Sequence, residues 1–338
     1  MFFKKHLFRA KHETPTRRIT ACELFTTFCE ASELDSSLYR IDWIRQLVSL
    51  LDDPQVAVHT AAWNAFDSFV KSVPKDELEP LVVPLRRTID STGAPGRTVP
   101  GFDLPKGVSP TVPIIIAGLT TGSNDQREQA AYAIGDLVER TSEVAIKPFV
   151  VPFTGPLIRV ATQAMTYPPG VKIAILSALT SMLERIPTFV KPFFPQLQRT
   201  FVKSVSDGSS ANVRTKAAEA LGVLMKHQPR VDPVVTELIT GTRGNEDSIA
   251  SSFLLALSKV LRSASQNVGE KAYESCVEVV ADAFRDSHSG QLFYYYYCFC
   301  CLPLAVSNLF STEHYSEAIG GLVKSLSMKP ELLRPITE

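Results

Sequence analysis

The sequence contains few cysteines, and their arrangement is not typical of a secreted or zinc-binding protein. Its 338 residues include six cysteines, whose spacing matches neither a disulfide framework nor a paired CxxC zinc site. They lie at Cys22, Cys29, Cys276, Cys298, Cys300 and Cys301. We therefore expect a reducing, cytoplasmic environment, and we expect no metal and no cofactor.

The chain also lacks an excess of charge of either sign. It has 35 basic and 35 acidic side chains and a formal net charge of +0, so its composition as a whole gives no attraction to nucleic acid or to an anionic membrane. Residues 1–16 are basic but lack the apolar core of a signal peptide, and we expect a disordered or frayed leader. The nearest approach to a membrane span, residues 291–310, is short in its apolar run, so no membrane association is expected.

Catalytic motifs are absent as well. The sequence has no GxGxxG after a strand, no GxxxxGK[ST], no HExxH and no GxSxG. His59 and His227 fall in predicted helices, where we expect them to be ordinary helix residues. The sequence therefore predicts a non-enzymatic protein without a small-molecule substrate.

Amphipathic helices in pairs are what the sequence does contain. Apolar residues recur at i, i+3, i+4 and i+7 in successive segments, and short turns rich in Asp, Asn and Ser separate them. Helices are expected over residues 19–30, 38–51, 56–70, 111–120 and 193–205. Second helices align on Ala130, Ala174, Ala217 and Phe253, which gives separations of 44, 43 and 36 residues. This period predicts an all-α fold, a HEAT- or armadillo-like α-solenoid of helix pairs over residues 17–338.

Two segments interrupt the repeats. Residues 91–107 are rich in Gly and Pro and form a long loop, which is either a partner site that projects from the array or a connector. Residues 287–312 contain FYYYYCFCCLP, whose cysteines are too crowded for one tetrahedral metal site. We interpret that segment as an irregular insertion, such as translated intron, in preference to a metal or membrane element.

Charge becomes one-sided between residues 149 and 230. This region contains ten basic and three acidic side chains. The basic ones are Arg159, Lys172, Arg185, Lys191, Arg199, Lys203, Arg214, Lys216, Lys226 and Arg230, and the acidic ones are Glu184, Asp207 and Glu219. Such a field attracts an acidic protein face or an RNA backbone. The phenylalanines of the region fit a buried helix face better than a base-stacking platform, which favours a protein partner.

Several motifs together resemble a known family. SLYRIDWIRQLVSLLDDPQVAVHTAAWNAFDSFVKSVPKDELEPLV, GAPGRTVPGFDLPKG, PFTGPLIRVATQ, FFPQLQRTFVKSVSD and TKAAEALGVLMKHQPRVDPVVTELITG are similar to the C-terminal part of the large HEAT-repeat translational activators of the general amino-acid control pathway. The resemblance implies a scaffold that rides on ribosomes and binds the kinase of initiation factor 2α during amino-acid starvation. Members of that family are several times longer, so the chain is either a fragment or a truncated gene product.

The resemblance also implies a contact residue. The segment similar to this chain binds the acidic N-terminal RWD domain of the kinase, through an arginine of the GPLIR motif that here is Arg159. The charge argument adds Arg199, Lys203, Lys172 and Arg214 as candidate partner-binding residues. Two alternatives stay open: a generic HEAT adaptor in transport or on the cytoskeleton, and direct contact of the basic region with RNA or the ribosome.

Overall fold

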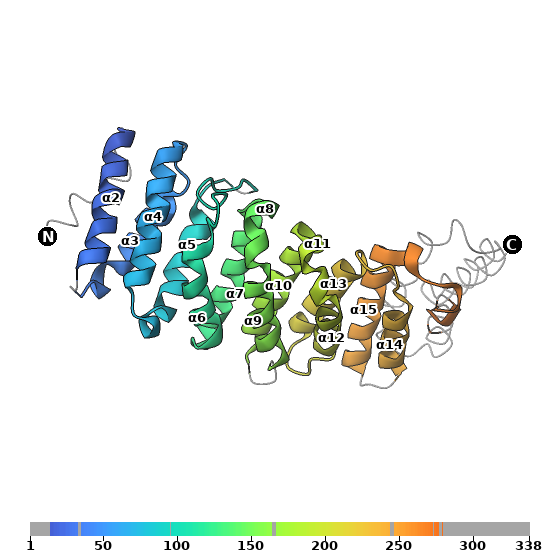
Figure 1. The fold of residues 1–338 in the computed structure, drawn as a ribbon. Coiled ribbons are helices and arrows are strands. Elements are labelled where there is room, and N and C mark those ends of the chain that lie inside the picture. The colour runs from blue at the N-terminus through green and yellow to red at the C-terminus, as the bar shows by residue number, and fades with distance from the viewer. Residues whose placement is uncertain are drawn as a thin grey trace, which may run out of the picture. The chain divides into compact units, whose positions relative to one another are not determined.

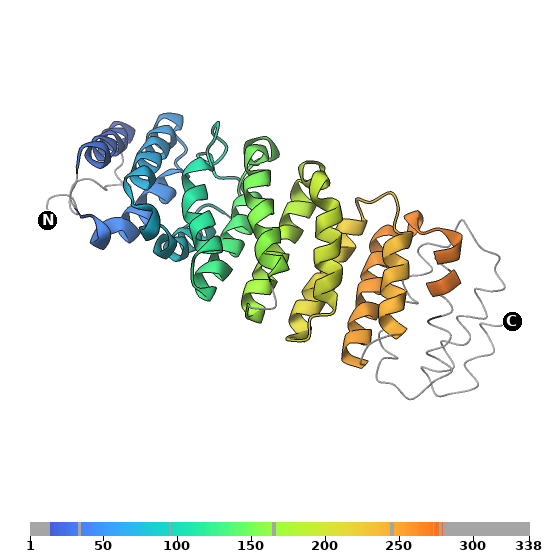
Figure 2. The same cartoon turned by 60° about the horizontal axis from the view of Figure 1, so that its bottom comes forward.

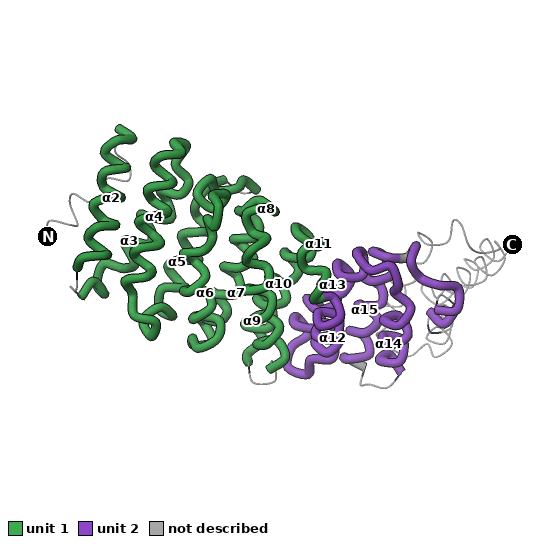
Figure 3. Tube along the Cα trace, viewed as in Figure 1, with its two compact units in different colours: residues 1–193 green, residues 194–338 purple. Residues whose placement is uncertain are grey.

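The structure, a computed structural model, describes residues 14–32, 35–94, 96–163, 167–243, 247–272, 274–276 and 279. The chain divides into two compact units, residues 1–193 and 194–338 (Figure 3). Within the described residues both units consist of helices and contain no strand, which confirms the all-α prediction. Each unit is a stack of helix pairs, as a HEAT-like solenoid requires (Figure 1).

Unit 1 begins with a helix and continues as pairs joined by short turns. Its longer elements are α2 (Pro15–Ala31), α3 (Arg40–Leu50), α4 (Val56–Ser72), α5 (Val82–Ser91), α6 (Val112–Thr120), α7 (Asn124–Glu139), α9 (Val150–Thr162) and α10 (Pro169–Arg185). Short elements connect them: η1 (Ser37–Tyr39), η2 (Lys75–Glu77), η3 (Glu79–Leu81), η4 (Ser109–Thr111), α8 (Glu143–Ile146), η5 (Lys147–Phe149), α11 (Pro187–Val190) and η7 (Lys191–Phe193). Second helices of neighbouring pairs pack together, α2 on α4 and α7 on α10 (Figures 1 and 2).

An aromatic cluster fills the first part of this unit. The rings of Phe25 and Trp43 meet edge to face with centroids 5.0 Å apart, and Trp43 meets Phe69 in the same manner at 5.8 Å. The three residues come from α2, α3 and α4, and all three are buried. Burying such rings is among the largest apolar contributions to folding, so this cluster holds the three helices together.

Local sequence explains where the helices begin. Ser123 caps α7, because its hydroxyl accepts the Gln126 N–H at 3.3 Å while the Gln126 side chain accepts the Ser123 N–H at 2.7 Å. Three predicted helices recur with small shifts at their ends: residues 38–51 become η1 followed by α3, residues 56–70 become α4, and residues 111–120 become α6.

The Gly- and Pro-rich loop between α5 and η4 is packed into unit 1. Val99, Phe102 and Val108 are each 0% exposed. The loop's backbone is bonded to its neighbours, since Gly101 N–H donates to Leu51 O at 2.8 Å and Val99 N–H donates to Arg140 O at 2.9 Å. It therefore fills the space between the turn after α3 and the end of α7.

Unit 2 repeats the paired arrangement. Its described elements are α12 (Phe194–Val205), α13 (Ala211–Met225), α14 (Asp232–Arg243), α15 (Asp247–Ala264) and η8 (Ser265–Asn267). Helix α13 packs on α12 and on α15, and α14 packs on α15. The segment 287–312, interpreted above as an insertion, and residues 1–13 of the basic leader lie outside the described residues.

Candidate protein-binding surface

Arg159 lies on the exposed face of α9. The buried side of this helix is formed by Val150, Phe153, Thr154, Leu157, Ile158 and Val160. Arg159 lies eight residues, or just over two turns, after the exposed Val151, so the two share the opposite side. The helix thus directs this side chain away from the core of unit 1.

The guanidinium of Arg159 is available to a partner. The residue is exposed, and within the described part of the chain no ion pair or side-chain hydrogen bond engages the guanidinium. Its backbone carbonyl accepts from the Thr162 hydroxyl at 2.8 Å, which keeps the last turn of α9 ordered beneath the side chain. An ordered helix that carries an unengaged arginine loses little freedom when a carboxylate-rich surface binds.

Arg199 and Lys203 occupy an equivalent position in unit 2. They are four residues apart on α12, both are exposed, and neither side chain pairs with a carboxylate among the described residues. The buried face of α12 is formed by Phe194, Leu197, Thr200, Phe201, Val202 and Val205. The i, i+4 spacing places the two charges one turn apart on the solvent side.

Two other candidates are part of the packing. Lys172 is only 6% exposed. Arg214 is half-buried and donates from Nε to Ser252 Oγ at 2.8 Å and from Nη1 to Asp207 O at 3.0 Å. Lys172 is thus buried and Arg214 is half-buried and hydrogen-bonded within its unit, so both side chains take part in packing.

The reason is a register that recurs in the second helices. In five of these helices the fourth residue is a basic or imidazole side chain: Arg18 in α2, His59 in α4, Arg127 in α7, Lys172 in α10 and Arg214 in α13; α15 has Ala250 there. Three of these side chains lie against carbonyls of the turn just before their helix. His59 Nδ1 is 2.9 Å from Asp53 O, Arg127 Nη2 is 2.7 Å from Thr120 O, and Arg214 reaches Asp207 O. Basic side chains at this position can thus take part in packing within the repeat.

Arg185 is a further example. At the end of α10 its guanidinium donates to the carbonyl of Glu139 at 3.2 Å, at the end of α7. A cation at this position satisfies a carbonyl that the helix leaves without a partner. Some of the basic side chains in the region are thus used within the fold. Of the candidate contact residues, Arg159, Arg199 and Lys203 are exposed, as are Lys191, Lys226 and Arg230 elsewhere in the region.

The described residues contain no group of three or more His, Cys, Asp and Glu side chains arranged to hold a metal ion. The three cysteines in this part are buried, and burial raises the thiol pKa to about 12 for Cys22, about 11 for Cys29 and about 12 for Cys276. Such thiols stay protonated at neutral pH and are poor nucleophiles.

Among the described residues, one continuous helical run meets the length and composition of a membrane span. It covers Glu143–Thr162, that is α8, η5 and α9, and half of it is buried inside unit 1. Buried core helices of soluble proteins have the same composition, so the run carries little weight as a membrane segment. The segment 291–310, considered in the sequence analysis, lies outside the described residues.

Comparison with known proteins finds a matching family model and relatives of similar sequence. Residues 2–106 match the family model described as stalled ribosome sensor GCN1-like, HEAT repeats. The chain is 39% identical over 279 residues to the eIF-2-alpha kinase activator GCN1 of Saccharomyces cerevisiae, an alignment that covers 82% of this chain and 10% of that protein. It is 36% identical over 255 residues to the stalled ribosome sensor GCN1 of Homo sapiens, covering 74% of this chain and 9% of that one. The chain thus spans about a tenth of the length of these relatives.

Solved structures with a similar fold include structures of importin beta. The structure of yeast importin-beta (Kap95p) aligns with a TM-score of 0.55 and 14% identity, over 96% of this chain and 47% of that one. A crystal structure of importin beta in an ammonium sulfate condition aligns with a TM-score of 0.54 and 15% identity, over 96% of this chain and 48% of that one. At this identity the likeness concerns the HEAT-type fold alone.

Proposed function

The chain belongs to the GCN1 family of HEAT-repeat proteins, and on that premise we propose that it is a non-enzymatic scaffold segment that binds the initiation factor 2α kinase. The partner surface is the acidic N-terminal RWD domain of the kinase. The contact residue is Arg159, in the GPLIR motif of α9. Arg199 and Lys203 on α12 are separate candidate contact residues in unit 2.

The exposed, unengaged guanidinium of Arg159 is the observation that carries this proposal. Arginine is enriched among the residues that dominate binding energy at protein interfaces, and it forms two parallel hydrogen bonds with a carboxylate. Lys172 and Arg214 are excluded from the proposed surface because their side chains are used within the units.

The wider role follows from the names of the relatives. One is an eIF-2-alpha kinase activator and another a stalled ribosome sensor, so we place the chain in cytoplasmic amino-acid starvation signalling on ribosomes. The chain covers about a tenth of those proteins. We propose that it supplies the kinase-binding step and that ribosome contact comes mostly from other regions.

A protein partner is favoured over RNA by the distribution of charge. Counterion release makes RNA affinity depend on the number of exposed basic groups. In the region 149–230 Arg185, Arg214 and Lys172 are engaged or buried, which reduces that number. An interface dominated by one arginine suits a protein domain better.

The proposal is tested by pull-down of the recombinant RWD domain with the full 338-residue chain and with Arg159→Ala. We expect the wild type to retain the domain and the variant to lose it, with an unchanged helical circular-dichroism spectrum. Arg87→Ala is the matched control, because Arg87 is an exposed arginine of α5 in the same unit. Retention of the domain by Arg159→Ala, or equal loss in both variants, overturns the assignment of the site.

A further inference from the structure

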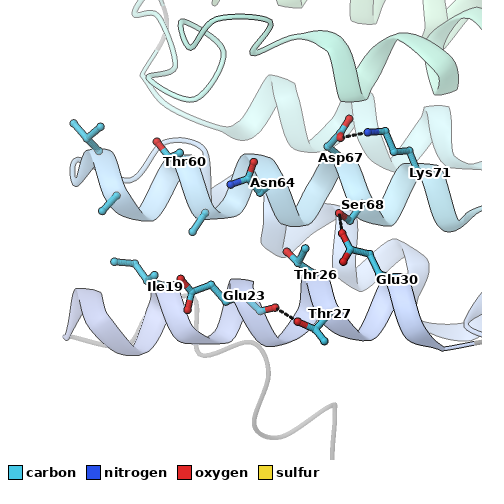
Figure 4. Close-up of a pocket in the computed structure, with 13 residues that line it drawn as sticks. Ile19, Glu23, Thr26, Thr27, Glu30, Thr60, Asn64, Asp67, Ser68 and Lys71 are labelled. Carbon is cyan, nitrogen blue, oxygen red and sulfur yellow. Dashed lines mark hydrogen bonds and ion pairs between the residues drawn. The ribbon is translucent and has the colours of Figure 1, made fainter.

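A groove runs between α2 and α4 in unit 1, away from α9. It encloses about 940 Å³ and is open along one side. Its lining residues are Ile19, Glu23, Thr26, Thr27 and Glu30 from α2, and Val56, Ala57, Thr60, Ala61, Asn64, Asp67, Ser68 and Lys71 from α4. Figure 4 shows the two helices side by side, with Ser68 of α4 meeting Glu30 of α2 across the space between them.

Small side chains keep the groove open. Ala57 and Ala61 follow each other by one turn of α4, and neither reaches far toward α2. Ile19 adds apolar surface from α2. The aliphatic stem of a lysine or arginine packs well on a floor of this kind while its charged end stays in water.

The charged side chains of the lining are mostly acidic. The lining contains three acidic side chains, Glu23, Glu30 and Asp67, and one lysine, Lys71. Lys71 Nζ lies 2.6 Å from an Asp67 carboxylate oxygen. Glu30 accepts a hydrogen bond from the Ser68 hydroxyl at 3.2 Å, and its second oxygen stays open. Glu23 and Glu30 are exposed and form no ion pair within the described residues. The groove thus presents two uncompensated carboxylates.

The remaining polar groups suit a peptide backbone. Asn64 and Thr60 are one turn apart on α4, and both line the groove. An asparagine amide offers both a donor and an acceptor, so it can bond an extended chain whose own N–H and C=O groups are unpaired. Carboxylates of the lining repel a phosphate backbone, which disfavours a nucleic acid.

We propose that this groove binds an extended basic segment of a partner protein. The distance from Ile19 to Glu30 along α2 corresponds to roughly 16 Å, because a helix rises about 1.5 Å per residue. At about 3.1 Å per residue, roughly five residues of polyproline II helix cover that length. The bound segment is therefore short.

The spacing of the carboxylates sets a preferred motif. Glu23 and Glu30 are seven residues apart on α2, which corresponds to roughly 10 Å. A polyproline II helix has three residues per turn and advances about 9 Å in that turn, so residues i and i+3 point to the same side. The groove accordingly selects two basic residues with two others between them, Lys-x-x-Lys or its arginine equivalent. This surface is separate from Arg159, and it does not depend on the RWD proposal.

The test uses a fluorescein-labelled seven-residue peptide that contains one Lys-Pro-Pro-Lys motif among glycines. Its binding to the full chain is measured by fluorescence anisotropy for the wild type and for Glu23→Gln/Glu30→Gln. We expect the double variant to bind about fivefold more weakly, since each exposed ion pair contributes modestly. A peptide of the same composition with adjacent lysines is expected to bind the wild type more weakly than the spaced one.

Two further variants distinguish binding in the groove from a general effect of negative charge on the chain. Glu143→Gln/Glu184→Gln removes the same number of exposed carboxylates from elsewhere in unit 1 and is expected to leave binding unchanged. Ala57→Trp keeps the charge and fills the exposed floor, and it is expected to weaken binding. Equal loss in both double variants, full binding by Ala57→Trp, or no binding by the wild type at about 1 mM peptide overturns the proposal.

Discussion

The indole N–H of Trp63 donates to the carbonyl oxygen of Gly107 at 3.0 Å. Trp63 belongs to α4, and Gly107 ends the long loop that precedes η4. This bond joins the loop to the second helix of the preceding pair. It explains in part why a segment of Gly and Pro holds a fixed place between two repeats.

Replacing Trp63 by Phe tests the bond. The substitution keeps a ring but removes the donor, which leaves the buried Gly107 carbonyl without its partner. We expect the free energy of unfolding to fall by about 1–2 kcal/mol, measured by urea denaturation. An unchanged midpoint and slope would show that water satisfies this carbonyl and that the loop is held by other contacts.

Two glycines give opposite predictions for substitution by Ala. A Cβ at Gly101 would lie 2.7 Å from Leu51 Cβ and 2.9 Å from Leu51 Cα, so Gly101→Ala is expected to cost about 2 kcal/mol of stability. At Gly135 in α7 an added Cβ makes only ordinary contacts, 3.8 Å from Ala178 Cα and 3.8 Å from Ser181 Oγ. Gly135→Ala is expected to stabilise by about 0.5–1 kcal/mol because alanine favours the helix. Thermal denaturation of both variants checks the pair, and equal shifts would contradict the packing of the loop.

Unit 2 offers a comparison of structural and exposed arginines. Arg214→Ala removes the bonds to Ser252 and Asp207 and is expected to destabilise by about 1.5–3 kcal/mol. The Arg199 side chain forms no ion pair or hydrogen bond among the described residues, so Arg199→Ala should change stability by less than about 0.5 kcal/mol. Chemical denaturation followed by circular dichroism measures both. Comparable losses would contradict the assignment of Arg214 to the packing.

Asp136 gives a prediction for pH. Burial raises the pKa of its carboxyl above the ordinary value of 3.8, and this outweighs the opposing effect of Arg86, whose Nε donates to it at 3.0 Å. The folded protein therefore binds this proton more tightly than the unfolded chain does. As pH rises from 3.8 through the raised pKa, wild type is expected to lose stability relative to Asp136→Asn.

The measurement is the difference in free energy of unfolding between the two proteins at several pH values between about 3.5 and about 7. A difference that moves the other way would mean that attraction by Arg86 dominates at this site. Asp125→Asn, in the exposed first turn of α7, is the matched control for removal of a carboxylate from the same helix.

The sequence predicted the helices well where the apolar spacing was regular. The helix expected from residue 56 begins there, and the turn at Ser123 forms a capping box because Gln126 lies three residues later. Such features depend on residues close in sequence. The period of the repeat then determined the fold class, since a helix pair buries its apolar face only against the next pair.

Long-range features could not be predicted in the same manner. The charge count treated Lys172 as exposed, whereas its register as fourth residue of a second helix makes it part of the interior. The same position holds Arg127 in α7 and Arg214 in α13. A comparison of this position across the repeats is therefore the signal in the sequence that Lys172 takes part in packing. The groove between α2 and α4 had no such signal, because its two walls are about 40 residues apart in sequence and meet only in the folded unit.

We propose that one side chain, Arg159, rather than the charge of the whole region, determines kinase binding. Calorimetric titration of the RWD domain into Arg159→Ala, and into the double variant Arg199→Ala/Lys203→Ala, tests it most directly. We predict that Arg159→Ala weakens binding by about thirtyfold or more, as expected for a residue that dominates an interface, and that the double variant loses much less. A larger loss in the double variant, or affinity unchanged by Arg159→Ala, would contradict the account.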